Sequence, residues 1–280
     1  MKNKILPILA AIILICALGI ALYPTVSQWV NELLSESAIT QYNDTVDTLS
    51  AEDKAVLLAE AEEYNRGLNE VVSDSFSSEA FAGDERYNSI LNITEDGQIG
   101  TINIPSIDCR LPIYHGSSED VLTKGAVHLA GTAFPIGGSS ARSVISAHTA
   151  FPGKIFFDKL TEVNIGDGFS VNVLGDTLYY KVVDINVVMP DETEYLMPEK
   201  GKDLITLVTC TPYSINTHRL LVTGERDNTP RVEMTAIEEP HTVPVDLGLS
   251  VALIITAIVS AMILIKRAAK RRKRKLKHEE

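Results

Sequence analysis

The sequence predicts a mainly β fold, a closed eight-stranded barrel or sandwich that is preceded by helices and flanked by two transmembrane helices. From Gln98 onward, eight short β-type runs follow one another with turn signals between them, the last of them ending at Gly224. Helical periodicity precedes them over residues 30–70. A strongly apolar run lies near each end of the 280-residue chain.

The first apolar run covers residues 5–22, follows two lysines and carries no charge. About 18 such residues are enough to span the hydrocarbon core of a bilayer. We therefore expect a transmembrane anchor over residues 5–23 with residues 1–4 in the cytoplasm. A cleavable signal peptide is the alternative, because Ala17-Leu18-Gly19 offers a small-x-small cleavage site.

The second apolar run covers residues 245–265 and leads directly into nine Lys or Arg within residues 266–277. This pattern predicts a second transmembrane helix and, by the positive-inside rule, a cytoplasmic basic tail over residues 266–280. A nucleic-acid patch is the alternative reading of the basic run, but its position after a span disfavours it. We therefore expect a cell-membrane protein with both termini in the cytoplasm and the intervening domain outside.

The two ends of the chain are basic, whereas the part between the apolar runs is acidic. Of the 25 Lys and Arg, two precede the first apolar run and nine follow the second, whereas all but three of the 37 Asp and Glu lie between the runs. The outer part is therefore strongly acidic, which argues against a nucleic-acid partner.

A helical arm is expected over residues 24–70. Apolar residues recur on one face at helical steps, and Ser50 precedes Ala51 as a cap: the face is formed by Leu57, Ala61, Tyr64 and Leu68. From residue 71 to 92 the pattern gives way to polar residues with isolated aromatics, which is typical of a loop docked at a few points.

The β-rich part is expected over residues 93–230 and is followed by a linker at 231–244. Its runs cover residues 99–105, 109–114, 126–131, 143–148, 169–174, 178–188, 204–210 and 219–224. One or two helical turns are expected near residues 153–160.

The three cysteines favour neither a disulfide framework nor a metal site, because their number is odd and none has metal-ligand spacing. Cys16 lies inside the first apolar run. Cys109 alternates with apolar residues, which indicates a small buried side chain. Cys210 remains as the chemically interesting thiol.

Cys210 ends a nearly apolar run that is expected to stop there, because Pro212 cannot donate to a sheet ladder. Arg219 opens the next run, so antiparallel pairing would make it a neighbour of Cys210. His148 ends a third run. A thiolate nucleophile, an imidazole acid and base and a cationic donor are the groups that thiol acyl transfer needs.

Residues 206–226, TLVTCTPYSINTHRLLVTGER, resemble the TLxTC signature and arginine strand of sortases, in particular the class C enzymes that polymerise pilins. Residues 104–138 and 146–160 also resemble that class, so the likeness covers about residues 50–226. It implies the eight-stranded sortase barrel, with Cys210 as thioacyl nucleophile, His148 as general acid and base, and Arg219 as substrate and oxyanion stabiliser.

The resemblance further implies a lid in which Asp74 and Phe76 plug the site, although Ser75 replaces the proline usual in that motif. It implies LPxTG-like sorting signals of pilins as substrates, a pilin lysine as acceptor amine, and no cofactor. Two alternatives remain at this point: a wall-anchoring sortase that transfers to a peptidoglycan amine, and a noncatalytic membrane-anchored β-domain.

Three other histidines are given structural or surface roles. His128 is expected to hydrogen-bond within the core, His115 to pack or lie at the surface, and His218 to face away from Arg219. No HExxH motif or second metal-spaced histidine supports a zinc hydrolase.

Overall fold

The computed structural model describes residues 5–68, 85–94, 96–116 and 118–229. Residues 27–229 form one compact unit that contains the barrel, and the chain up to Val26 belongs to a second unit. The expected linker, second transmembrane helix and basic tail, like most of the expected lid, lie outside the described residues.

Two long helices form the arm. Helix α1 spans Ile5–Thr48, α2 spans Ala51–Gly67, and Ser50 between them forms a capping box with Asp53, as its position predicts. Within the described residues one helix, Ile12–Thr48, is long and apolar enough to cross a membrane. This agrees with the first expected span, and the alternative of a signal sequence remains open.

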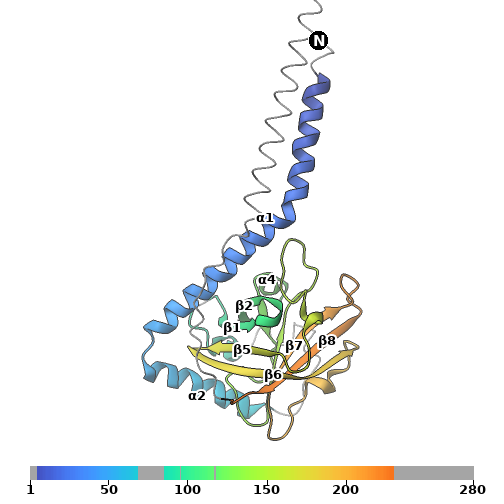
Figure 1. The fold of residues 1–280 in the computed structure, drawn as a ribbon. Helices are drawn as coiled ribbons and strands as arrows, with labels where there is room; N and C mark the ends of the chain where they lie inside the picture. Colours follow the sequence, from blue (N-terminus) through green and yellow to red (C-terminus); the bar gives the residue numbers. More distant parts are fainter. Residues whose placement is uncertain (1–4, 69–84, 95, 117, 230–280) are drawn as a thin grey trace, which may run out of the picture. The chain divides into compact units, whose positions relative to one another are not determined.

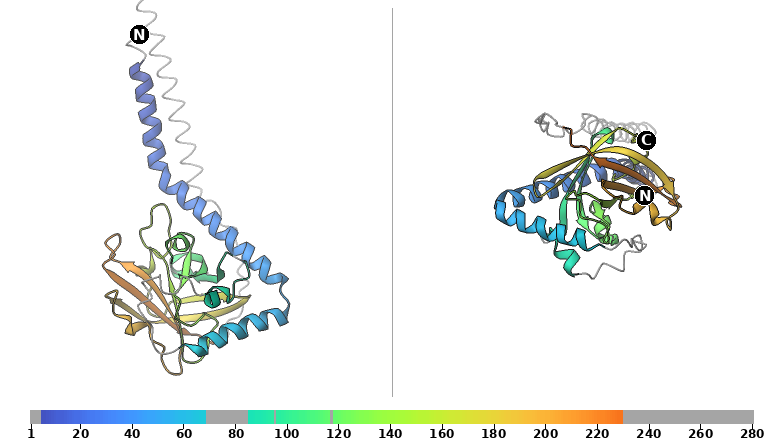
Figure 2. Two further views of the ribbon diagram at one scale, coloured as in Figure 1. Left: turned by 180° about the vertical axis from the view of Figure 1, so that it is seen from behind. Right: turned by 90° about the horizontal axis from the view of Figure 1, so that it is seen from below.

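The second half of α1 and the whole of α2 lie against one side of the barrel (Figures 1 and 2). Ile39, Tyr42 and Val46 of α1 are buried there. The Tyr42 hydroxyl donates to the Ile99 carbonyl oxygen at 2.9 Å and accepts the Leu174 N–H at 3.1 Å. Burial raises the pKa of Tyr42 to about 12. The arm is therefore fixed to the barrel by apolar burial and by two hydrogen bonds at one residue.

The eight expected strands are all present and close into a barrel in the order β1-β2-β3-β4-β7-β8-β6-β5. They are β1 Gln98–Ile104, β2 Cys109–His115, β3 Ala126–His128, β4 Ala141–Ser146, β5 Gly168–Val173, β6 Asp176–Val188, β7 Asp203–Thr211 and β8 His218–Arg226. The shorter helices are α3 Glu85–Ser89, η1 Pro105–Ile107, α4 Glu119–Leu122, η2 Leu160–Glu162 and η3 Thr193–Leu196.

Two of the barrel's strand pairs are parallel, β2 with β3 and β4 with β7. The second matters most, because parallel strands end at the same edge of a sheet. Strand β7 also pairs antiparallel with β8, so the end of β4, the end of β7 and the start of β8 meet at one end of the barrel.

Alternate residues of β4, β7 and β8 face two different apolar clusters. Ile145, Leu207 and Val222 belong to the large cluster that fills the barrel. Their sequence neighbours belong to a smaller cluster of Leu129, Val144, Val188, Leu196, Val208 and Leu221. Since successive strand residues face opposite sides, this second cluster lies on the outer face of the sheet. Cys210 and Arg219 have the parity of Val208 and Leu221, so they share that outer face.

The prediction of one or two helical turns near residues 153–160 is wrong. The segment forms turns instead, and a 3-10 helix begins only at Leu160. The Asp158 carboxylate accepts the backbone N–H groups of Ala150 and Phe156, each at 2.9 Å, and Gly153 has a φ of 74°. These donors are satisfied by a side chain rather than by a helical ladder, a competition that periodicity does not reveal.

Candidate active site

Cys210 and Arg219 are direct cross-strand partners in the β7–β8 pair. Residues that oppose each other in an antiparallel pair have Cβ atoms about 4.5–5.5 Å apart on the same face. The expected adjacency of these two residues is thus confirmed in the backbone register. Both side chains are partly exposed, which leaves them accessible to a substrate.

His148 reaches the same end of the barrel through β4. Ser146 pairs with Val208, and the contact continues beyond the strand: the Ala147 N–H donates to the Val208 carbonyl oxygen at 3.1 Å, and Thr209 Oγ1 donates to the Ala147 carbonyl oxygen at 2.8 Å. If the register of the Ser146–Val208 pair is continued by two residues, His148 lies opposite Cys210, on backbones about 4.8 Å apart. Histidine, cysteine and arginine therefore occupy three adjacent strand ends.

The imidazole of His148 is held by a neighbour to which the sequence assigns no role. The Phe151 ring stacks on it with centroids 5.2 Å apart and planes 29° apart. Nε2 of His148 is buried and has no hydrogen-bond partner among the residues that the structure describes. A buried ring nitrogen that its described neighbours leave unused is suited to proton transfer with a bound substrate.

The two cysteines of the barrel have opposite environments. Cys109 is 8% exposed and its Sγ lies 3.4 Å from the Phe156 carbonyl oxygen. Burial, helped by the charges of Asp108 and Asp158, raises the pKa of the Cys109 thiol to about 12. The expectation of a buried Cys109 is confirmed, and Cys210 is the accessible thiol of the barrel.

The loop between β7 and β8 forms one border of the site. The guanidinium of Arg219 donates through Nη1 to the carbonyl oxygens of Asn216 and His218, each at 3.3 Å. Tyr213 and Ile215 of this loop are 64% and 66% exposed. The sequence reasoning missed these two side chains. The sequence feature that could have identified them is an apolar or aromatic residue on either side of Ser214, in a loop between two strands.

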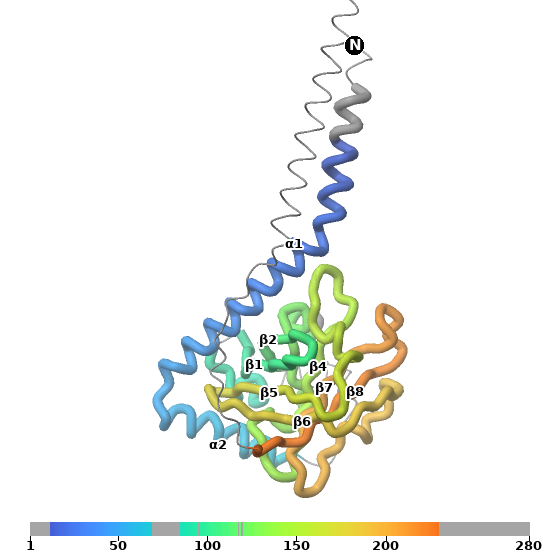
Figure 3. Tube along the Cα trace, viewed as in Figure 1, coloured from blue at the N-terminus to red at the C-terminus, as the bar shows by residue number. Residues whose placement is uncertain are grey.

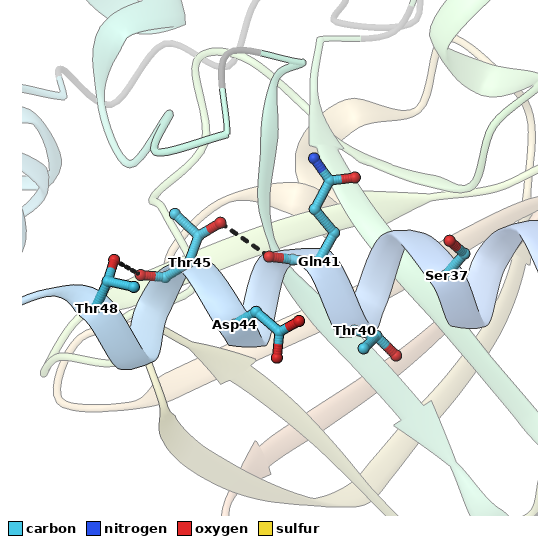
Figure 4. A pocket seen from close by; sticks show the side chains of 6 residues that line it. All are labelled: Ser37, Thr40, Gln41, Asp44, Thr45 and Thr48. Atoms are coloured by element: carbon cyan, nitrogen blue, oxygen red, sulfur yellow. Dashed lines mark hydrogen bonds between the residues drawn. The ribbon is translucent and has the colours of Figure 1, made fainter.

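Figure 3 shows this loop in orange and the yellow-green segment after β4 protruding from the same end of the barrel. The hollow drawn in Figure 4 lies elsewhere, on the exposed face of α1. Its threonine hydroxyls bond within the helix, such as Thr45 Oγ1 to the Gln41 carbonyl oxygen at 2.8 Å. It brings together none of the groups that acyl transfer needs.

Two further histidines have structural roles. His128 is fully buried, with Nδ1 3.0 Å from the Tyr87 hydroxyl and Nε2 2.9 Å from the Ala133 carbonyl oxygen, as expected of a core histidine. His115 is 6% exposed and its ring nitrogens contact two backbone carbonyls, so it packs inside rather than at the surface.

No cluster of three or more His, Cys, Asp or Glu residues able to hold a metal occurs in the part of the chain that the structure describes. The expected lid residues, Asp74 and Phe76, lie outside that part.

The barrel matches known proteins by sequence and by structure. A family model described as the sortase domain matches residues 102–227. The crystal structure of sortase C-1 from Actinomyces oris is 44% identical, with a TM-score of 0.59, and the match covers 63% of this chain and 99% of that one. The chain belongs to the sortase family. The members of this family are cysteine transpeptidases.

Other sortases extend the comparison. The pilus-related sortase C of Group B Streptococcus is 39% identical with a TM-score of 0.63, covering 68% of this chain and 97% of that chain. Among curated proteins, sortase A of Bacillus anthracis is 29% identical over 127 residues, which are 45% of this chain and 59% of that protein. The chain thus spans nearly the whole of the class C structures and rather more than half of that curated relative.

Proposed function

We propose that this protein is a class C sortase, which cleaves an LPxTG-like sorting signal of pilin subunits and joins the released acyl group to a pilin lysine. The observation that carries the proposal is the arrangement of His148, Cys210 and Arg219 on the adjacent ends of β4, β7 and β8. The similarity to solved class C sortases, one of them described as pilus-related, supports the choice of substrate.

In the first half-reaction the Cys210 thiolate attacks the carbonyl carbon of the scissile peptide bond. The oxyanion that forms is stabilised by the Arg219 guanidinium beside the thiol. His148 as imidazolium gives its proton to the departing amine, so the C–N bond breaks and a thioester to Cys210 remains. The C-terminal fragment of the sorting signal leaves as a neutral amine.

In the second half-reaction an amine attacks the thioester. His148, now neutral, takes a proton from the attacking nitrogen, and Cys210 leaves as a thiolate. With a pilin lysine the product is an isopeptide bond between two subunits, and the enzyme returns to its starting state. Water in place of the amine would give simple hydrolysis.

The apolar cluster outside the sheet supports the strand ends that carry the site. Val208 and Leu221 lie one step along the same face from Cys210 and Arg219, and both are buried in one cluster with Leu196 of the β6–β7 connection. Their burial stabilises the strands on which the thiol and the guanidinium stand.

The full-length chain in detergent, incubated with candidate pilins, tests the proposal. A ladder of covalent pilin polymers that depends on Cys210 is the expected product. Release of the peptide fragment by the Cys210→Ala protein would refute the mechanism. A wall-anchoring sortase, the alternative that the sequence leaves open, would join the acyl group to a peptidoglycan amine and form no ladder.

A further inference from the structure

The segment after His148 is a loop closed at its base. The Phe157 N–H donates to the His148 carbonyl oxygen at 3.0 Å, and the Asp158 carboxylate accepts two backbone N–H groups from within the loop. Near its tip, Phe151 stacks on the His148 ring. A displacement of the tip would therefore reach the imidazole through Phe151, because the base of the loop cannot absorb it.

The tip of this loop is bound by helix α1. Ser27 Oγ donates to the Gly153 carbonyl oxygen at 2.9 Å, and Asn31 Nδ2 donates to the same oxygen at 2.8 Å. Ser27 and Asn31 are four residues apart, so they lie on one face of the helix. The second hydrogen of the Asn31 amide is used by the Ser27 carbonyl oxygen at 2.7 Å, which fixes the orientation of the amide.

Helix α1, which carries both donors, is fixed to the barrel close to them. Arg110 of β2 pairs with Glu36 of α1 at 3.1 Å, and beyond it Ile39 and Tyr42 are buried against the barrel. The helix is therefore held to the barrel within two turns of Asn31. In the other direction Ser27 is four positions beyond Tyr23, the last residue of the expected transmembrane anchor. The residues of α1 that contact Gly153 thus lie, along the sequence, between the apolar segment and the part of the helix that is fixed to the barrel.

We propose that Ser27 and Asn31 are positioning residues that set the orientation of His148 by holding the Gly153 carbonyl. They touch no substrate and act through Gly153 and Phe151. The kinetic part of this inference rests on the proposed function, because it assumes that His148 transfers protons in acyl transfer. The structural part, restraint of the loop by α1, does not.

The test uses the full-length chain in detergent. Ser27→Ala removes one donor, and Asn31→Asp is isosteric but has no N–H to give and places a negative charge beside a carbonyl oxygen. Ser27→Thr keeps the hydroxyl and is the rescue variant. Two matched controls lie on the same helix: Thr40→Ala removes a hydroxyl that donates only within the helix, and Asn43→Asp makes the same charge change at an exposed position.

For cleavage of a sorting-signal peptide, we expect the double variant S27A/N31D to lose about 10-fold in kcat with KM changed less than about 2-fold, because misplacement of a catalytic group affects the transition state. S27T should keep nearly the full kcat. A loss of kcat that T40A or N43D shares would overturn the proposal, since it would reflect the helix as a whole.

Hydrogen–deuterium exchange separates the two parts of the inference. We expect the amides of residues 149–157 to exchange faster in S27A/N31D than in the parent protein, with β7 unchanged. Equal exchange in this loop would overturn the proposal whatever the kinetics. If the parent protein cleaved no peptide, the proposed function would fail, while the exchange measurement would still decide whether α1 holds the loop.

Discussion

Cys210 of β7 lies directly opposite Arg219 of β8, one pair before the strands separate into the Pro212–Thr217 loop. The pairing continues without a shift from Leu204 and Glu225 to Thr211 and His218. The sheet itself therefore holds the backbones of these two residues side by side. This relationship leads to the first prediction.

Replacing Arg219 with lysine should lower kcat/KM for the sorting peptide by about 100-fold, although the positive charge is kept. A lysine ammonium offers no planar fork of donors, and the loss of a preorganised oxyanion donor is typically of this size. Steady-state kinetics measure the effect. Arg86→Lys, a surface residue paired with Glu63, is the matched control and should stay within about 2-fold. Equal behaviour of the two variants would contradict the role given to Arg219.

Native protein treated with iodoacetamide at pH 7 should be alkylated at Cys210 and not at Cys109. The reason is access together with protonation, since Cys109 is buried with its pKa raised to about 12 whereas Cys210 is partly exposed. Peptide mass spectrometry distinguishes the two sites, and denatured protein, in which both cysteines should react, is the control. Alkylation of Cys109 as fast as Cys210 in the folded state would show that the environments were misassigned.

The stability of the barrel should fall as the pH drops below about 6.5. Burial lowers the pKa of His128 to about 3. At pH values between this pKa and the ordinary one, the histidine is neutral in the folded protein and protonated in the unfolded chain. Above pH 6.5 both states are neutral and the histidine has no effect. Between pH 6.5 and 3 each unit should cost about 1.4 kcal/mol, because protonation then favours the unfolded chain.

His128→Gln isolates this contribution, because glutamine keeps an N–H for the Ala133 carbonyl but does not titrate. The variant should be less stable at pH 7, since it loses the contact with Tyr87. Its further loss of unfolding free energy between pH 7 and pH 5 should be about 2 kcal/mol smaller than that of the parent. His115, whose pKa burial also lowers, is present in both proteins and cancels in the comparison. Urea titrations that gave parallel pH dependences would exclude this role for His128.

Gly224→Ala should destabilise the protein by about 1–3 kcal/mol. An added Cβ would fall on the Phe169 ring and 3.1 Å from the Tyr180 Cβ, and these two buried rings are stacked with centroids 5.5 Å apart, so neither can yield. Thermal unfolding measures the change. Gly67→Ala is the control, since nothing lies within 4 Å of its added Cβ at the end of α2, and it should be neutral or slightly stabilising. A neutral Gly224→Ala would mean that the rings are not packed as described.

Most of the local structure could be predicted from the sequence because it depends on near neighbours. The eight strands follow from runs of β-branched residues between turn signals, and the start of α2 follows from Ser50 and its capping partner. The expected helical turns at residues 153–160 failed for the same local reason, since one aspartate captured the backbone donors that a helix would have used.

The sequence by itself determined the adjacency of Cys210 and Arg219, because two strands joined by a short loop pair antiparallel and bring a strand end to the next strand start. It also marked His148 as a strand end. Only the tertiary structure decided that β4 pairs parallel with β7, which brings His148 to Cys210, and that Ser27 and Asn31 meet Gly153. Such contacts join residues tens to more than a hundred positions apart, and closure of the barrel fixes them where no local periodicity records them.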